Sequence, residues 1–263
     1  MNLEDIHQQA IELIKSTGDF IRQEAKGFSS EDIEQKGLND LVSYVDKEAE
    51  KKLVEGLSAL LPEAGFIAEE GTSNKKGDLY NWIIDPLDGT TNFIHGLPVY
   101  SISVALQKEN ELISGIVYEV NRDECFHAYK GSDAFLNEKK ISVSKDKDLS
   151  QSLIATGFPY YDFEQLDAYV RILKSLMQAS HGLRRLGSAA VDLAYVACGR
   201  FEGFYEYNLN AWDVAAGAFI VQQAGGKVST FSNGENFVFG REIVAACPKV
   251  HTELLTHIAK EWK

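Results

Sequence analysis

The sequence has few of the features that mark secreted or membrane-spanning proteins. Its three cysteines, Cys125, Cys198 and Cys247, are odd in number and far apart, so they predict neither a disulfide framework nor a metal-binding spacing. We expect reduced, buried thiols, which suit the cytoplasm. No apolar run approaches the ~20 residues of a membrane span, and the N-terminus lacks the design of a signal peptide. We therefore expect a cytoplasmic protein with no membrane partner.

Positive charge is also scarce. The 263 residues include 26 Lys and Arg against 39 Asp and Glu, which gives a net charge of −13. Such a chain repels the phosphate backbone, so we expect no direct nucleic-acid partner. It also repels a small anionic substrate unless bound metal supplies local positive charge. The hydrophobic share of 44% is ordinary for a globular protein and is ample for a core.

Hydrophobic periodicity predicts two subdomains that meet near residues 144–149. Residues 1–145 are predicted to form an antiparallel sheet with helices on one side, and residues 146–263 a layered α/β unit. The first half has predicted helices over 3–24 and 44–61, with strands over 65–68, up to Asp85, and over 99–107, 112–119, 124–130 and 134–143. The second half has predicted strands over 153–156, 183–186, 201–206 and 243–247, alternating with helices over 162–179, 189–199, 213–224 and from 248 onward.

The most informative segment covers residues 81–93. An apolar run stops at Asp85, and Asp88 follows within a Pro/Gly turn. Two carboxylates so spaced can converge on hard divalent cations, with the Leu87 carbonyl as another ligand. If a helix begins after Gly89, its free N–H groups could receive a phosphate. Asp-Pro and Asp-Gly pairs are also ordinary turn formers, so this segment alone leaves a plain strand-end turn open.

Three more carboxylates stand where predicted strands end or helices begin. Glu69 closes a strand as Asp85 does, while Asp213 and Asp46 lie at or near helix starts. Alone, Asp213 is equally a helix N-cap, and Asp46 complements a helix dipole. Together these carboxylates could hold two or three divalent ions. Paired ions can hold an attacking water and stabilise a leaving oxygen in one displacement.

Several segments along nearly the whole chain carry a family resemblance. They are Lys36–Asp46, Phe66–Glu70, Trp82–Phe93, His95–Pro98, Gly187–Ala190, Phe204–Glu206 and Trp212–Gly217. In this order and at this separation they resemble the inositol monophosphatase family, part of the lithium-sensitive, magnesium-dependent phosphatases. The Asp-Pro-x-Asp-Gly-Thr pattern marks only the superfamily. Its continuation through Thr91–Phe93 and the Trp-Asp-Val-Ala-Ala-Gly segment are similar to the monophosphatase branch.

The resemblance implies an α/β/α/β/α sandwich, the sugar-phosphatase fold, with metal between its two halves, and a homodimer. It implies that Glu69, Asp85 and the Leu87 carbonyl bind one Mg²⁺. A second Mg²⁺ would be bound by Asp85, Asp88 and Asp213. A third, weaker ion would sit near Glu69 through waters. Glu69 thus counts as catalytic, and Asp88 and Asp213 also border the substrate.

The resemblance also assigns the attacking water and the substrate. Thr90, supported by Asp46, would orient and help deprotonate the water, and the amides of Gly89 and Thr90 would hold the phosphate. Lys36 matches a lysine on a mobile loop near the metals. Contacts to the alcohol part of the substrate are implied for Gly187, Ser188, Ala189 and Glu206.

The implied function is Mg²⁺-dependent hydrolysis of a phosphate monoester, foremost myo-inositol monophosphate, by direct attack of water without a phosphoenzyme. Asn210 departs from the family pattern, because some members have a basic or ring-bearing residue there near the leaving alcohol. Related alternatives are a nucleotide 3′-phosphatase, a fructose-bisphosphatase or a histidinol-phosphate phosphatase. An alternative of another class is a protein-binding regulator of the RNA-processing and transcription machinery. For the Arg184-Arg185 pair we favour structural pairing over phosphate binding.

Overall fold

The computed structural model describes residues 2–28, 33–37, 40–145, 147–159 and 162–262. The helices in these ranges are α1 (Leu3–Glu24), α2 (Tyr44–Leu60), α3 (Thr90–Ile94), α4 (Leu166–Ala179), α5 (Ala189–Ala197), α6 (Ala211–Gln223) and α7 (Pro248–Glu261). Among the described residues, none of these helices is both long and apolar enough to cross a bilayer.

The strands fall into two large sheets and a small hairpin. The seven-stranded sheet has the order β3 (Gly65–Ala68), β4 (Tyr80–Asp88), β5 (Ser101–Lys108), β6 (Glu111–Glu119), β7 (Glu124–Tyr129), β8 (Phe135–Leu136) and β9 (Lys139–Lys140). The five-stranded sheet has the order β11 (Gly182–Arg184), β10 (Leu153–Thr156), β12 (Gly203–Tyr207), β14 (Glu242–Ala246) and β13 (Lys227–Ser229). The hairpin joins β1 (Ile33–Gly37) to β2 (Asp40–Ser43).

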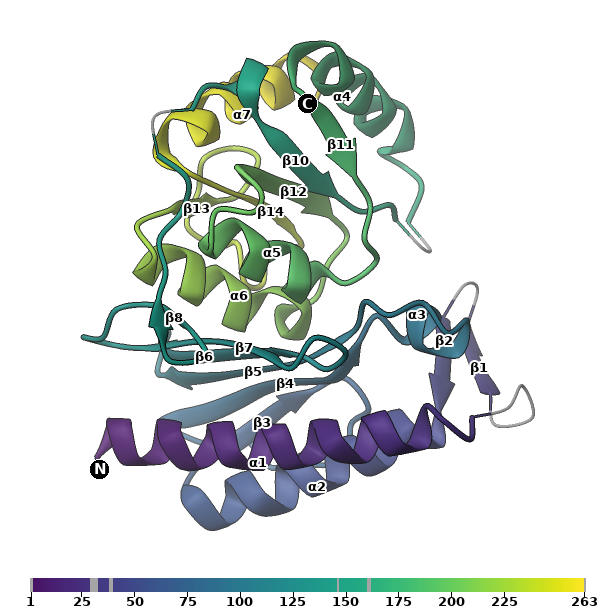
Figure 1. Ribbon diagram of the computed structural model, residues 1–263, viewed down its shortest axis with the longest axis vertical. Helices are drawn as coiled ribbons and strands as arrows, with labels where there is room; N and C mark the ends of the chain where they lie inside the picture. Colours follow the sequence, from purple (N-terminus) through teal and green to yellow (C-terminus); the bar gives the residue numbers. More distant parts are fainter. Residues whose placement is uncertain (1, 29–32, 38–39, 146, 160–161, 263) are drawn as a thin grey trace.

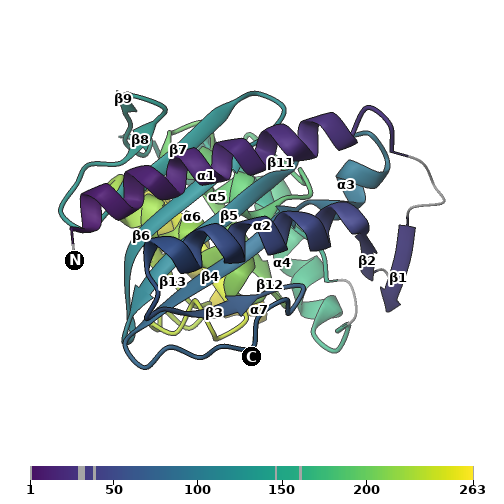
Figure 2. The same ribbon diagram turned by 90° about the horizontal axis from the view of Figure 1, so that it is seen from below.

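These elements stack in five layers, as the family resemblance implies (Figure 1). Helices α1 and α2 run side by side over one face of the seven-stranded sheet (Figure 2). Helices α5 and α6 lie between the two sheets, and α4 and α7 cover the far face of the five-stranded sheet. The fold is therefore the expected α/β/α/β/α sandwich. Division into 1–145 and 146–263 stays a prediction, because α5 and α6 of the second half pack against both sheets.

The alternation of side chains along β4 explains why both faces of its sheet are covered. Ile83 belongs to the core between the two sheets, while Trp82 and Ile84 belong to the core under α1 and α2. Successive side chains of a strand point to opposite faces, so a strand that is apolar throughout must be covered on both sides. Helix α1 contributes Ala10, Ile14 and other side chains at helical spacing to this core between the helices α1 and α2 and the seven-stranded sheet.

The structure corrects four expectations about the elements. The first half is not purely antiparallel, since β3 and β4 run parallel; its own helices α1 and α2 lie on one side of its sheet as expected, and α5 and α6 of the second half cover the other. The predicted strand over 134–143 is two short strands, because Asn137 has a φ of +52° and turns the chain between them. The three-residue strand β13 was not predicted. Cys198 is only partly buried, whereas Cys125 and Cys247 are buried as expected, and all three thiols are free.

Candidate active site

The end of β4 brings its two aspartates to one side of the sheet. Residues three apart in a regular strand point to opposite faces. Pairing with β5 shifts register between Asp85 and Asp88, so that three steps on β4 match two on its partner. This irregularity includes Pro86, which has no N–H to donate to a ladder. The expectation that the strand stops at Asp85 was wrong: it continues through a bulge to Asp88, and the bulge re-aims the second carboxylate.

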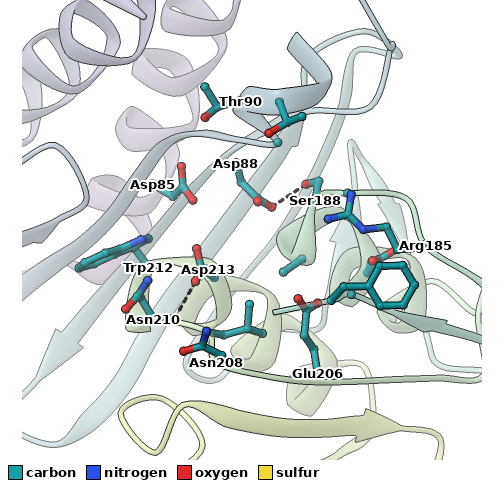
Figure 3. A pocket seen from close by; sticks show the side chains of 18 of the residues that line it. Asp85, Asp88, Thr90, Arg185, Ser188, Glu206, Asn208, Asn210, Trp212 and Asp213 are labelled. Atoms are coloured by element: carbon teal, nitrogen blue, oxygen red, sulfur yellow. Dashed lines mark hydrogen bonds between the residues drawn. The ribbon is translucent and has the colours of Figure 1, made fainter. Parts of the chain in front are cut away.

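Asp213 joins this pair from the other half of the chain. Oxygen atoms of Asp85, Asp88 and Asp213 lie within 4.8 Å of one another, and Figure 3 shows their carboxylates turned together. Asp213 stands in the first turn of α6, where its Oδ2 accepts a hydrogen bond of 2.6 Å from the Asn210 N–H. The N-cap is therefore Asn210 rather than Asp213 as considered from the sequence; Asp213 is the third residue of the helix, where it completes the capping box and also belongs to the acidic cluster.

Asp88 is held by the start of α5. Its Oδ2 accepts hydrogen bonds from the Ser188 hydroxyl at 2.5 Å and from the Ala190 N–H at 2.7 Å. Ser188 also caps α5 by accepting from the Val191 N–H at 3.3 Å. The Ser188 hydroxyl therefore faces Asp88, and its expected contact with the alcohol part of a substrate stays a prediction.

Burial and mutual repulsion disfavour charge on this cluster. Burial raises the pKa of Asp85 well above its ordinary value, and nearby Glu69, Asp88 and Asp213 raise it further. Burial also raises the pKa of Asp88 to about 6 and, helped by the Asp88 charge, that of Asp213 to about 7. Carboxylates gathered in such a setting are stabilised by a cation, which offsets both effects.

The donor set of the pocket suits a hard divalent cation such as Mg²⁺. Carboxylates are the most frequent charged groups of the described lining, in which neither His nor Cys occurs, and Glu69 and Leu87 line it beside the three aspartates. Oxygen-only sites favour Mg²⁺, Ca²⁺ or Mn²⁺ over Zn²⁺ or copper. The pocket has a volume of about 380 Å³ and lies between the two halves of the chain.

Thr90 and Asp46 form a hydrogen-bonded pair beside the cluster. The Thr90 hydroxyl lies 2.9 Å from Asp46 Oδ1 and 3.0 Å from the Leu87 carbonyl oxygen. The other carboxylate oxygen of Asp46 accepts from the Ser43 N–H at 2.8 Å and the Ser43 hydroxyl at 2.6 Å, which completes the capping box of α2. Asp46 is thus both a helix-capping residue and a fixed acceptor for Thr90.

Gly89 joins β4 to α3 in a conformation that other residues adopt with strain. Its φ is +98°, and a Cβ there would lie 3.0 Å from the Val99 carbonyl oxygen. The start of α3, Gly89 to Thr91, borders the pocket. Lys36 lies in β1, and its side chain falls outside the part of the structure that is described.

The far side of the pocket is built by Glu206 and the loop before α5. Glu206 is buried on β12, and a Cβ on Gly157 would lie only 2.0 Å from its Oε1, so that position needs glycine. Gly187 and Ala189 line the pocket beside Ser188. All the predicted site residues with described side chains, together with Gly89 and Gly187, thus lie in or directly against one pocket.

Sequence reasoning missed several lining residues. Arg185 borders the pocket, and its guanidinium lowers the pKa of Asp88, Asp192 and Glu206 against the larger, opposite effect of burial. The sequence analysis favoured structural pairing of this arginine over phosphate binding, and that choice stays a prediction. Asp192 and Asn208 also line the pocket. Nothing in their local sequence marks them, because neither belongs to a metal or phosphate motif.

Comparison with known proteins gives the family. The model of the inositol monophosphatase family matches residues 2–263. "Putative Nus factor SuhB" of Neisseria meningitidis serogroup B is 42% identical over 251 residues, covering 95% of this chain and 96% of that protein. "Inositol-1-monophosphatase" of Rhizobium meliloti is 45% identical over 192 residues, 73% of this chain and 72% of that protein.

A solved structure shares the fold over nearly its whole length. The extragenic suppressor protein SuhB from Bartonella henselae matches with a TM-score of 0.91 and 35% identity, covering 97% of this chain and 99% of that one. Agreement of family model, relatives and fold leaves one assignment: the chain belongs to the inositol monophosphatase family.

Proposed function

We propose that this protein is a Mg²⁺-dependent phosphatase that hydrolyses myo-inositol monophosphate to myo-inositol and inorganic phosphate. The observation that carries the proposal is the cluster of three carboxylates within 4.8 Å, beside the Thr90–Asp46 pair. Relatives named inositol-1-monophosphatase support the substrate. The buried Glu206 supports an alcohol rich in hydroxyl groups, because a carboxylate accepts hydrogen bonds from them.

Glu69, Asp85 and the Leu87 carbonyl would hold one Mg²⁺, and Asp85, Asp88 and Asp213 a second, with a third, weaker ion near Glu69. When bound, Mg²⁺ neutralises phosphate oxygens and lowers the pKa of the attacking water. The amides at the start of α3 would receive the phosphate. Positive charge is needed because the pocket is acidic, with Arg185 as its only basic residue in the described lining.

The chain itself positions the water through Thr90. The Thr90 hydroxyl directs its proton to Asp46 Oδ1 or to the Leu87 carbonyl, so its oxygen lone pairs remain to accept a proton from water. Asp46 can in turn draw the threonine proton, since its other oxygen is fixed by Ser43. This relay provides general-base assistance without a covalent phosphoenzyme.

Phosphate release from D,L-inositol 1-phosphate tests the function. We expect turnover with Mg²⁺, none with EDTA, and suppression when Li⁺ accompanies Mg²⁺. Parallel assays use adenosine 3′,5′-bisphosphate, fructose 1,6-bisphosphate and histidinol phosphate. Mg²⁺-dependent turnover confined to one of these three would keep the reaction class and remove the inositol substrate. Equal turnover in EDTA would contradict the metal.

A second candidate function comes from the relatives named Nus factor SuhB, a name that points to transcription. The intact acidic cluster favours hydrolysis but leaves room for a second role. Asp88→Ala separates the two functions in cells whose own copy of the gene is deleted. Loss of hydrolysis without rescue of the growth defect caused by the deletion supports the enzyme. Loss of hydrolysis with the phenotype rescued supports the regulator.

We also propose that the protein works in the cytoplasm as a homodimer, in line with its free thiols and with the family resemblance. Exposed apolar side chains of Phe158, Val170 and Met177 lie on and beside α4, next to the sheet-edge strand β11. A second copy would cover them. Sedimentation velocity should give about twice the chain mass of 29.2 kDa, and Met177→Glu should shift the protein toward monomer. A monomeric wild type at micromolar concentration would contradict this.

A further inference from the structure

Arg241 lies outside the pocket lining and forms hydrogen bonds to residues of one wall of the pocket. Its carbonyl oxygen accepts from the N–H of Asn208 at 2.6 Å and of Leu209 at 3.2 Å. Its guanidinium donates to the Asn208 carbonyl at 3.4 Å, to the Asn208 side-chain oxygen, and to Asn210 Oδ1 at 3.1 Å. One residue thus binds the turn that follows β12 through both its main chain and its side chain.

These hydrogen bonds fix the orientation of the side-chain amide of Asn208. A guanidinium only donates hydrogen bonds, so the amide atom that faces Arg241 must be the oxygen. The nitrogen therefore lies at the other end of the group. Asn208 Nδ2 is buried, and within the described part of the chain it has no hydrogen-bond partner. Buried donors without partners are rare, because each loses its hydrogen bonds to water without replacement.

The unpartnered nitrogen belongs to a pocket-lining residue on the alcohol side. Asn208 follows Glu206 by two residues and lines the same pocket. In Figure 3 the nitrogen end of the amide lies nearer Asp213 than the oxygen end does. A φ of +66° holds Asn208 in the left-handed region, which asparagine tolerates better than most residues. The backbone conformation of Asn208 and its hydrogen bonds to Arg241 together hold the amide nitrogen in place.

We propose that Asn208 is a specificity-determining residue that donates a hydrogen bond from Nδ2 to a hydroxyl group of the substrate alcohol, with Arg241 as its positioning residue. This inference rests on the proposed phosphatase function and narrows its substrate class. The class is a phosphate monoester of a polyol with at least two further free hydroxyl groups, one for Glu206 and one for Asn208.

The polar groups of the wall suit a hydroxyl group. Glu206 is buried on the same side, and the buried Asp192 has an oxygen, Oδ1, with no hydrogen-bond partner among the described residues. Carboxyl oxygens accept hydrogen bonds from hydroxyl groups. Asn208 supplies the complementary donor. A wall with both acceptors and a donor matches a hydroxyl, which can donate and accept.

The decisive variant is Asn208→Asp. It keeps the shape of the side chain, tolerates the positive φ, and still offers an oxygen to Arg241, but it replaces the donor with an acceptor. We expect kcat/KM for D,L-inositol 1-phosphate to fall about tenfold, chiefly through KM, because one substrate hydrogen bond is lost. For phenyl phosphate, whose alcohol has no free hydroxyl, the change should stay within about twofold.

Two further variants complete the test. Arg241→Asn removes the guanidinium and should reproduce the loss on inositol 1-phosphate, with a smaller loss on phenyl phosphate because the Arg241 charge also lowers the pKa of Asp213. The double variant should be no worse than Arg241→Asn alone, because the two residues act as a unit. Asn233→Asp is the matched control. It makes the same chemical change at another positive-φ asparagine, exposed and outside the pocket lining, and should leave both substrates unaffected.

The outcomes distinguish this proposal from the proposed function. If the contact between Asn208 and Arg241 is purely structural, Asn208→Asp should have the same kcat/KM as the wild type for both substrates. That result would overturn the proposal. Equal losses on both substrates would overturn it too. If the wild type hydrolyses neither compound, the function fails first, and calorimetric binding decides the inference. Equal affinity of wild type and Asn208→Asp for inositol 1-phosphate, or no binding by either, would then refute it.

Discussion

Asp85→Asn should lower kcat by at least about a hundredfold while raising the melting temperature of the metal-free protein. The buried carboxylate of Asp85 lies between Glu69, Asp88 and Asp213, all of which raise its pKa. Neutralising it removes repulsion that a bound proton or a bound cation otherwise offsets. Its contact with the Leu87 N–H, 3.0 Å from Oδ1, survives in the amide. The gain in EDTA should be about 3 °C.

Glu202→Gln is the matched control for this prediction. Glu202 is also buried, but it is satisfied by Lys147 and by the Leu153 N–H at 2.7 Å, and it lies outside the pocket lining. Losing its charge should lower the melting temperature and leave kcat within about twofold. Phosphate release and thermal unfolding in EDTA measure both variants. An Asp85→Asn protein that is active, or less stable than the wild type without metal, would contradict the ion-binding interpretation.

Stabilisation by Mg²⁺ should grow as the pH rises from 5.5 to 8. Raised carboxyl pKa values mean that the metal-free folded chain holds protons which the unfolded chain has released. Its stability is therefore full below the ordinary pKa of 3.8 and falls as the pH passes about 6 for Asp88 and about 7 for Asp213. Mg²⁺ replaces these protons. The stabilisation of the folded protein by Mg²⁺ is therefore small at pH 5.5 and large at pH 8.

The measurement is the difference in melting temperature between saturating Mg²⁺ and EDTA across this pH range. Taking the difference cancels groups remote from the site, such as buried His7, whose pKa burial lowers to about 3. An increase of about 5–10 °C at pH 8 is expected for an ion at a hundred times its dissociation constant. A difference that is flat with pH would mean that the ion binds elsewhere. Asp213→Asn should flatten the profile.

Much of the site could be predicted because its parts are local in sequence. Asp85, Leu87, Asp88 and Thr90 lie within one short segment, and the bulge in β4 serves to bring its two aspartates together. The alternation of strands and helices likewise predicted the second sheet, except for β13, which is too short to show a period. The parallel pairing of β3 with β4 depends on long-range register, which periodicity does not report.

The contacts that could not be predicted join residues far apart in the chain. Arg241 reaches Asn208 across 33 positions, and Ser188 reaches Asp88 across 100. Neither partner has a local pattern that names the other. Both contacts come from the way α5 and the turn after β12 are carried by the five-stranded sheet. The Asn208 wall of the pocket is therefore a property of the assembled fold, whereas the acidic residues of the β4 segment are largely a property of the motif.

The hydrogen bonds between Asp88 and the start of α5 make the site depend on correct docking of the two halves of the chain. Asp88 comes from the first half of the chain, and the groups that orient it, Ser188 and Ala190, come from the second. A copy whose halves have not docked lacks this orientation and also lacks Asp213 beside it. Such a copy would not hydrolyse the proposed substrate, even with both sheets formed. If the proposed function holds, cation binding would therefore report completed assembly, and misassembled copies would stay inactive without a separate inhibitor.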